Sequence, residues 1–334
     1  MTRKPVPIAS GVCVVLLLLW WPVITSSYWL SASTVTVVFS LVALSVGLLL
    51  GQVGMVSLSQ IALMAVGSWV GLRLGYATEL PFPVIVLFSG VASALAGVAI
   101  GLPSLWVGGL AFALLTLMGA SAITLVLSRI NFPNGGDGLL GYSQTGAGSP
   151  AITRPSIATS DEAYFRYVLV IAAVLFLVVW LHTRSRAGRG WATIRQSPAA
   201  ATAAGVNITL YRLWAFVLAA GIAGIAGALL AATAGVAVQQ FPVQDSIILL
   251  AAVMMAGAGH LWGAVVAAVL LKLIGAALSL GGFPPELLLV LFGAGVIQSI
   301  LQSPGGIVGQ LSGVLRRLSR RWGSSFRRKR RQIT

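Results

Sequence analysis

We predict that this 334-residue chain is an all-α, polytopic membrane protein of about ten transmembrane helices. Its composition supports this fold class, because 58% of the residues are hydrophobic and only 8% are charged. A water-soluble domain carries about 25% charged residues, since its surface faces water. In addition, apolar runs of about 20 residues alternate with short polar connections, and such a run crosses a hydrocarbon core of about 30 Å.

The expected spans follow one another along most of the chain. They run over residues 10–30, 33–50, 53–72, 82–102, 105–130, 164–182, 211–232, 245–259, 263–281 and 285–302. Residues 131–163 form the longest polar connection, and residues 183–211 form a basic one. Glycines at helical spacing, such as Gly67 and Gly71 or Gly221, Gly224 and Gly227, predict close helix packing. We therefore expect a first helix with its preceding residues (1–32), a core (33–310) and a basic tail (311–334).

The first span also fits a second interpretation. Arg3 and Lys4, the apolar stretch that follows and the small residues at 31–33 match the pattern of a secretory signal peptide. We favour a retained helix, because the run continues through Trp20 and Trp29 and is long enough to cross a bilayer and end in an aromatic belt.

The distribution of charge predicts the orientation. If the chain starts inside the cell, 16 of the 21 basic residues are cytoplasmic: two at the N-terminus, five from Arg184 to Arg212 and nine in the tail. All six acidic residues then lie outside or at the outer ends of spans. This positive-inside pattern predicts that both termini are cytoplasmic. Because the tail directly follows an apolar span, its charge predicts binding to anionic lipid and not to nucleic acid.

The spans lack the residues of an enzyme or of an ion-coupled pump. No acidic residue falls at the centre of a span, and no nucleotide-binding, zinc-protease or nucleophile motif occurs. The single cysteine, Cys13, excludes an internal disulfide and a multi-cysteine metal site, so we expect no cofactor and no metal. Lys272 is the one charged residue at the centre of a span, where it either orients the helix or contacts a substrate.

The basic connection contains a short predicted helix. Ser197 and Pro198 form an N-cap and first-turn pair, residues 199–204 are strong helix formers, and Gly205 suits a left-handed C-terminal cap. A helix of two turns is marginal in water, so it is held by the bundle or by a partner. Two interpretations stay open, a basic linker facing lipid and a socket for a soluble motor subunit.

This connection resembles the cytoplasmic coupling loop of the branched-chain amino-acid ABC permease family, specifically its M-type (LivM-like) subunit. The matching residues are Ser185, Gly188, Arg189, Ile194, Arg195, Ala200, Ala201, Gly205, Val206 and Asn207. Residues 51–60, 101–103, 116–117, 134–139, 257–263 and 303–309 also resemble family segments in order and spacing, so the likeness covers roughly residues 33–310. The chain departs from the family at Gln60, Gln196 and Pro198, which puts the substrate and the charge of the ATPase-facing surface in question.

The resemblance implies a type II ABC importer-like permease in the bacterial cytoplasmic (inner) membrane. It implies four kinds of partner or cargo: a second homologous permease subunit, two cytoplasmic ATP-binding subunits, an extracytoplasmic solute-binding protein, and branched-chain amino acids or similar small solutes. The chain itself is then a transporter subunit and not an enzyme, because its partners hydrolyse ATP. The residues expected to contact the ATPase are Arg189, Trp191, Ile194, Arg195 and Gly205.

The resemblance implies that most specificity lies with the binding protein, so the translocation path needs few ligands. The candidates for this path are Gln52, Ser57, Gln60, Thr116 and Lys272. Three alternative functions remain at this stage. They are a sugar or nucleoside permease of the same superfamily, a facilitator that works without ATP, and a membrane-embedded enzyme, against which the lack of paired reactive residues argues.

Overall fold

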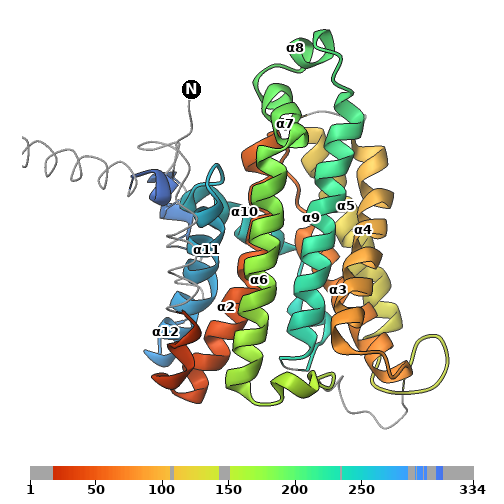
Figure 1. Cartoon of the computed structure of the whole chain (residues 1–334), viewed down its shortest axis with the longest axis vertical. Coiled ribbons are helices and arrows are strands. Elements are labelled where there is room, and N and C mark those ends of the chain that lie inside the picture. Colours follow the sequence, from red (N-terminus) through yellow and green to blue (C-terminus); the bar gives the residue numbers. More distant parts are fainter. Residues whose placement is uncertain are drawn as a thin grey trace, which may run out of the picture.

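The computed structural model describes residues 18–105, 109–142, 151–233, 235–284, 290, 292–295, 297–298 and 306–310. Within these ranges the chain is helical, which confirms the predicted fold class (Figure 1). The elements are η1 (Trp21–Val23), α2 (Ser27–Leu48), η2 (Leu49–Val53), α3 (Gln60–Ala77), α4 (Phe82–Leu105), α5 (Leu110–Ile130), η3 (Ser156–Ala158), α6 (Asp161–Arg184), α7 (Arg186–Gln196), α8 (Pro198–Ala203), α9 (Ile208–Ala231), η4 (Val238–Gln240), α10 (Gln244–Ala256), α11 (Leu261–Ala268), η5 (Val269–Leu273) and α12 (Ile274–Leu280).

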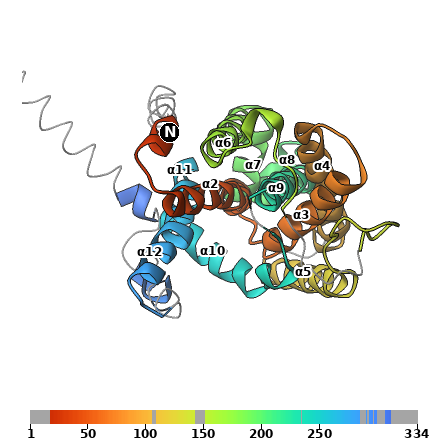
Figure 2. The same cartoon turned by 90° about the horizontal axis from the view of Figure 1, so that it is seen from below.

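Helix α9 lies at the centre of the bundle, packed against α2, α3 and α4 (Figure 2). Small residues allow these close approaches. A Cβ at Gly67 of α3 would overlap the backbone of Gly224 on α9, and a Cβ at Gly97 of α4 would overlap the side chain of Ala220. The glycine pattern in the sequence thus serves helix packing, which within a bilayer depends on such contacts between backbones.

The outward faces of α4, α5 and α6 carry exposed large apolar side chains, among them Leu95, Leu125 and Leu181. The most apolar 18-residue window of α2 is 78% buried inside the molecule, whereas that of α5 is only 28% buried. Apolar surface on this scale requires a hydrocarbon environment. The chain is therefore a multi-pass membrane protein.

Seven helices within the described ranges are long and apolar enough to cross a membrane. They comprise α2 with η2, α4, α5, α6, α9, η4 with α10, and the continuous α11–η5–α12. Helix α3, which matches the third predicted span, is not among them, and its two ends carry Gln60 and Arg73. Residues 10–17 of the first predicted span, most of the tenth and all of residues 311–334 lie outside the described residues, so the predicted number of about ten is approximate.

Two predicted boundaries were wrong. Residues 27–30 belong to the start of α2 and not to the first span. The third span does not begin at residue 53, because η2 ends at Val53 and is followed by Gly54, whose φ of +81° is a left-handed conformation that favours glycine. Residues 54–59 are then non-helical, and α3 begins at Gln60.

Candidate functional site

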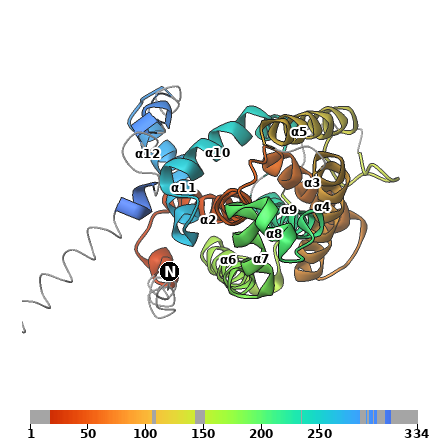
Figure 3. The same cartoon turned by 90° about the horizontal axis from the view of Figure 1, so that it is seen from above.

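Residues 185–205 fold into two short helices, α7 and α8, at one end of the bundle (Figures 1 and 3). Ser197 caps α8 as predicted, since its Oγ accepts a hydrogen bond from the Ala200 amide at 3.2 Å. Gly205 follows α8 with φ +75°, as a left-handed cap requires. The sequence prediction missed α7, which begins after Ser185, whose Oγ accepts from the Ala187 amide at 3.2 Å.

One face of α7 is buried inside the chain. Trp191 is 0% exposed and Ile194 is 1% exposed, at the helical spacing of three residues that places both on one face. The indole Nε1 of Trp191 donates to the Tyr211 carbonyl at 2.8 Å. Gly190 lies against the Tyr211 ring, where a Cβ would overlap it. Trp191 and Ile194, which were expected to contact the ATPase, therefore hold α7 against its own bundle.

Arg195 reaches from α7 to the end of α2. Its Nη1 donates a hydrogen bond to the Gly51 carbonyl in η2, and its side-chain carbons pack against Gly54. Element η2 is a π-helical turn, a local widening that occurs often at functional sites. The structure thus joins two segments 144 residues apart.

The opposite face of α7 and most of α8 are exposed. Arg186 and Arg189 project from α7, and the small side chains at 199, 200, 202 and 203 cover α8. The sequence contains no acidic residue from 163 to 244. This exposed surface, which we call the α7–α8 surface, is therefore basic at its α7 part and small and apolar at its α8 part.

Three of the predicted path residues come together around residues 54–59. The Thr116 hydroxyl accepts from the Leu58 amide at 3.1 Å, Ser57 and Ser59 share a hydroxyl contact at 3.1 Å, and Ser45 donates to Gln60 Oε1 at 3.0 Å. The side chains of Ser45, Ser57, Ser59, Gln60 and Thr116 are all buried. Within the described part of the chain, Nε2 of Gln60 has no hydrogen-bond partner.

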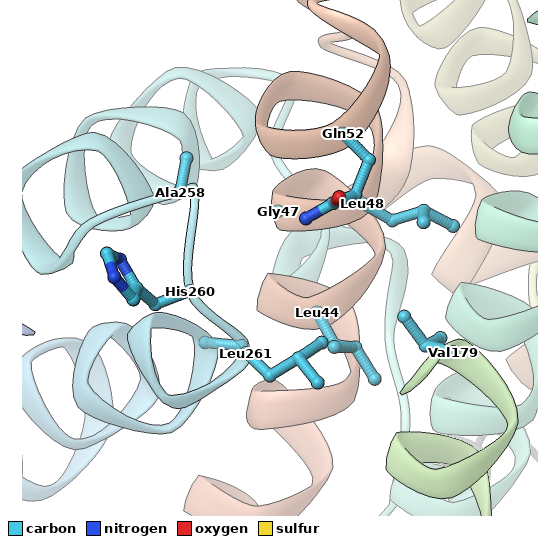
Figure 4. Close-up of a pocket in the computed structure, with 9 residues that line it drawn as sticks. Leu44, Gly47, Leu48, Gln52, Val179, Ala258, His260 and Leu261 are labelled. Atoms are coloured by element: carbon cyan, nitrogen blue, oxygen red, sulfur yellow. The ribbon is translucent and has the colours of Figure 1, made fainter. Parts of the chain in front are cut away.

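The other two path candidates lie elsewhere. Gln52 lines a small pocket with Leu48 of α2, Val179 of α6 and His260 (Figure 4). Lys272 lies in η5, a second π-helical turn, with Nζ 3.8 Å from the centroid of the Phe39 ring on α2. Asp245, at the start of α10, interacts electrostatically with Lys272. The ammonium group of Lys272 thus lies over an aromatic face.

The described residues contain no cluster of three or more His, Cys, Asp or Glu side chains that could hold a metal ion. The chemistry of this region is accordingly that of hydroxyls, amides and guanidinium groups. Such groups bind and position other groups through hydrogen bonds.

A model of the family described as "Branched-chain amino acid transport system / permease component" matches residues 28–299. The chain belongs to this permease family. Similar proteins are the high-affinity branched-chain amino acid transport system permease protein LivM of Salmonella typhimurium, 27% identical over 270 residues, and that of Escherichia coli, 26% identical over 279 residues. The matches cover 75% and 78% of this chain and 64% and 66% of those relatives. The chain thus spans under two thirds of the relatives' length in the first case and about two thirds in the second.

Among solved structures, PsaBC from Streptococcus pneumoniae in complex with Fab is similar with a TM-score of 0.46 and 14% identity, over 89% of this chain and 99% of that chain. Membership in the permease family confirms the resemblance predicted from the sequence, which rested on residues 33–310. The family match also includes α7 and α8.

The end of this permease that lies away from α7 and α8 carries two arginines that bind loops. Arg73 of α3 donates to the carbonyls of Gly136, at 3.3 Å, and Gly138. Arg154 forms an ion pair with Asp161 at 2.6 Å and donates Nε to a carbonyl at the end of α9 at 3.1 Å. These contacts hold residues 131–142 and 151–160 against the helix ends.

Proposed function

We propose that the chain is the transmembrane subunit of an ATP-driven importer for branched-chain amino acids in the bacterial cytoplasmic membrane. The α7–α8 surface is the observation that carries this proposal. A basic surface without acidic residues, on helices anchored by Trp191 and Ile194, is suited to bind an acidic face of a soluble subunit. Family membership supports the permease role.

In this proposal α7 and α8 are the docking site for one of two cytoplasmic ATP-binding subunits. Arg189 provides an exposed charge for that contact, and Gly205 sets the direction in which the chain leaves α8. Trp191 and Ile194 act from within, because their burial fixes the position of α7. A second, homologous permease subunit and an extracytoplasmic solute-binding protein complete the importer.

The translocation path is proposed to involve Ser57, Gln60 and Thr116, whose polar groups meet where α2 and α3 are separated by non-helical backbone. Polar backbone within a membrane is tolerated where it is buried in protein or lines a cavity. Gln52 and Lys272 are proposed as further contacts at separate points.

In the proposed orientation the α7–α8 end and both termini are cytoplasmic. The five basic residues from Arg184 to Arg212 are then inside, as the positive-inside rule requires. The nine basic residues of the tail bind anionic lipid of the inner leaflet.

The test is purification of the tagged chain from its native membrane, followed by L-leucine uptake in proteoliposomes with and without internal ATP. We expect an ATP-binding subunit and a second permease to copurify, and uptake to require ATP. Arg189→Glu should lower recovery of the ATPase about ten-fold, since reversal of an interfacial charge costs on the order of 1–2 kcal/mol. The matched control is Arg166→Glu, which reverses an exposed charge near the opposite end of α6 and should leave recovery unchanged.

The alternatives appear as other outcomes of the same experiment. Recovery of the chain alone, with solute flux that does not depend on ATP, would favour the facilitator. ATP-dependent uptake of a sugar or nucleoside in place of leucine would keep the architecture and replace the cargo.

A further inference from the structure

The hydrogen bond from Arg195 to the Gly51 carbonyl connects α7 with a junction in the bundle. Element η2, which contains Gly51, continues α2 and is followed by the left-handed Gly54. On its other side Gly51 lies against the turn between α10 and α11, where a Cβ would overlap the Ala258 carbonyl. One short segment therefore contacts α7, α2 and the α10–α11 turn.

The segment that follows η2 is attached to the membrane-embedded helices by hydroxyl groups. Thr116 of α5 binds the Leu58 amide, and Ser45 of α2 binds Gln60 at the start of α3. A displacement of η2 is thus passed to α2, α3 and α5 through direct contacts. The buried Nε2 of Gln60 has no acceptor among the described residues. An unpaired buried donor is costly, which favours a second arrangement of this segment in which the amide is paired.

We infer that Arg195 is a positioning residue that transmits movement of α7 to η2, and that it does not bind the ATPase. This inference rests on the proposed function. The guanidinium group is suited to this task, because it stays charged and its planar donors hold the carbonyl in a fixed direction. The Arg195–Gly51 contact moves as one unit, so that a push on the α7–α8 surface shifts η2 and the non-helical segment 54–59.

The first experiment compares Arg195→Gln with wild type in the intact importer, reconstituted with L-leucine as the probe. A hydrogen bond from a charged donor shifts an equilibrium by about ten-fold or more. We therefore expect leucine uptake per ATP hydrolysed to fall about ten-fold, while the amount of copurified ATPase stays the same. Arg189→Glu is expected to behave in the opposite way, with loss of the ATPase itself. Arg166→Gln serves as the control for removal of an arginine outside this region.

The second experiment replaces the hydrogen bond by a covalent bond. A Cβ built on Gly54 lies 3.9 Å from the Cβ of Arg195, which is within the range of about 3.5–4.5 Å found in disulfides. The variant Gly54→Cys/Arg195→Cys in a Cys13→Ser background should be uncoupled when reduced and should regain leucine uptake when oxidised. The single variant Gly54→Cys, which is strained by the positive φ, measures the cost of that position alone.

The outcomes separate the two proposals. Wild-type importer without ATP-dependent leucine uptake would overturn the proposed function and this inference with it. Normal coupling in Arg195→Gln, or loss of the ATPase from it, would overturn the inference alone. Failure of the two cysteines to form a disulfide, or no recovery of uptake after oxidation, would contradict the contact or its role.

Discussion

The two ends of the helix bundle use arginine in different ways. At the end that carries residues 131–142 and 151–160, Arg73 and Arg154 are bound to backbone carbonyls, and Arg154 also pairs with Asp161. At the α7–α8 end, Arg186 and Arg189 are exposed, and no acidic residue occurs in the sequence from 163 to 244. Arg189 reaches only a nearby carbonyl, that of Arg184, at 3.5 Å. Arg195 differs because it binds a distant segment, through the Gly51 carbonyl.

This difference distinguishes arginines that stabilise the fold from arginines that are available to bind another molecule. An arginine whose donors are bound to carbonyls fixes a loop, and its removal acts on stability. An exposed arginine contributes little to stability of the isolated chain, so a basic surface without acidic residues of its own is available to bind another molecule. The α7–α8 end presents such a surface because the buried side chains of Trp191 and Ile194 hold α7 against the bundle.

The largest expected effect comes from removal of that anchor. In Trp191→Ala a fully buried side chain is lost, which destabilises by about 3–5 kcal/mol. We expect a clear decrease of the unfolding temperature in detergent and rapid proteolysis between residues 184 and 207. The measurement is thermal unfolding of the purified chain, combined with mapping of cleavage sites.

The matched control for this variant is Trp191→Phe. It keeps most of the ring and removes the Nε1 hydrogen bond to the Tyr211 carbonyl, so it should lose only about 1 kcal/mol. Equal unfolding temperatures for wild type and Trp191→Ala would contradict the anchoring role and the contrast between the two ends.

The α7–α8 region also shows which features a sequence can reveal. Helix α8 was predicted correctly, because Ser197, Pro198 and Gly205 are local signals whose effect does not depend on the rest of the fold. Helix α7 was missed, since it is stabilised by burial of Trp191 and Ile194 against distant segments. The available signals were the spacing of these two residues and the capping residue Ser185.

The candidate path shows the same limit. Apolar residues continue from 53 to 72, so the sequence predicts an unbroken helix there. The non-helical segment 54–59 exists because Gly54 adopts a positive φ and because Thr116, from another helix, binds the Leu58 amide. The types of residue at Ser57, Gln60 and Thr116 suggested a polar path, but only the fold brings them together. The partner of Arg195 likewise lies 144 residues away.

A smaller effect is expected from the cap of α8. Ser197→Ala removes the hydrogen bond to the Ala200 amide and should destabilise this helix by about 1 kcal/mol. Because α8 has only six residues, we expect it to unfold locally while the bundle stays intact. Hydrogen exchange of the Ala201 and Ala204 amides measures this, and Ser197→Thr, which retains a capping hydroxyl, should exchange as wild type does. Uniform acceleration of exchange throughout the chain would show that α8 is not a separate unit.

The smallest effect is expected at the opposite end, from Arg154→Gln. Asp161 is 60% exposed and Arg154 is 23% exposed at their side chains, so solvent screens the pair and its contribution is a few tenths of a kcal/mol. Loss of the Nε hydrogen bond to the Ala232 carbonyl adds to this, and we expect a total below about 1 kcal/mol that decreases at high salt. Unfolding of Arg154→Gln, Asp161→Asn and the double variant at two salt concentrations gives the coupling between the two side chains. ATP-dependent leucine uptake should be unchanged, because this arginine is structural. If uptake were lost while the unfolding temperature stayed constant, Arg154 would also serve a binding contact, and the two ends of the bundle would not differ in the way that the structure indicates.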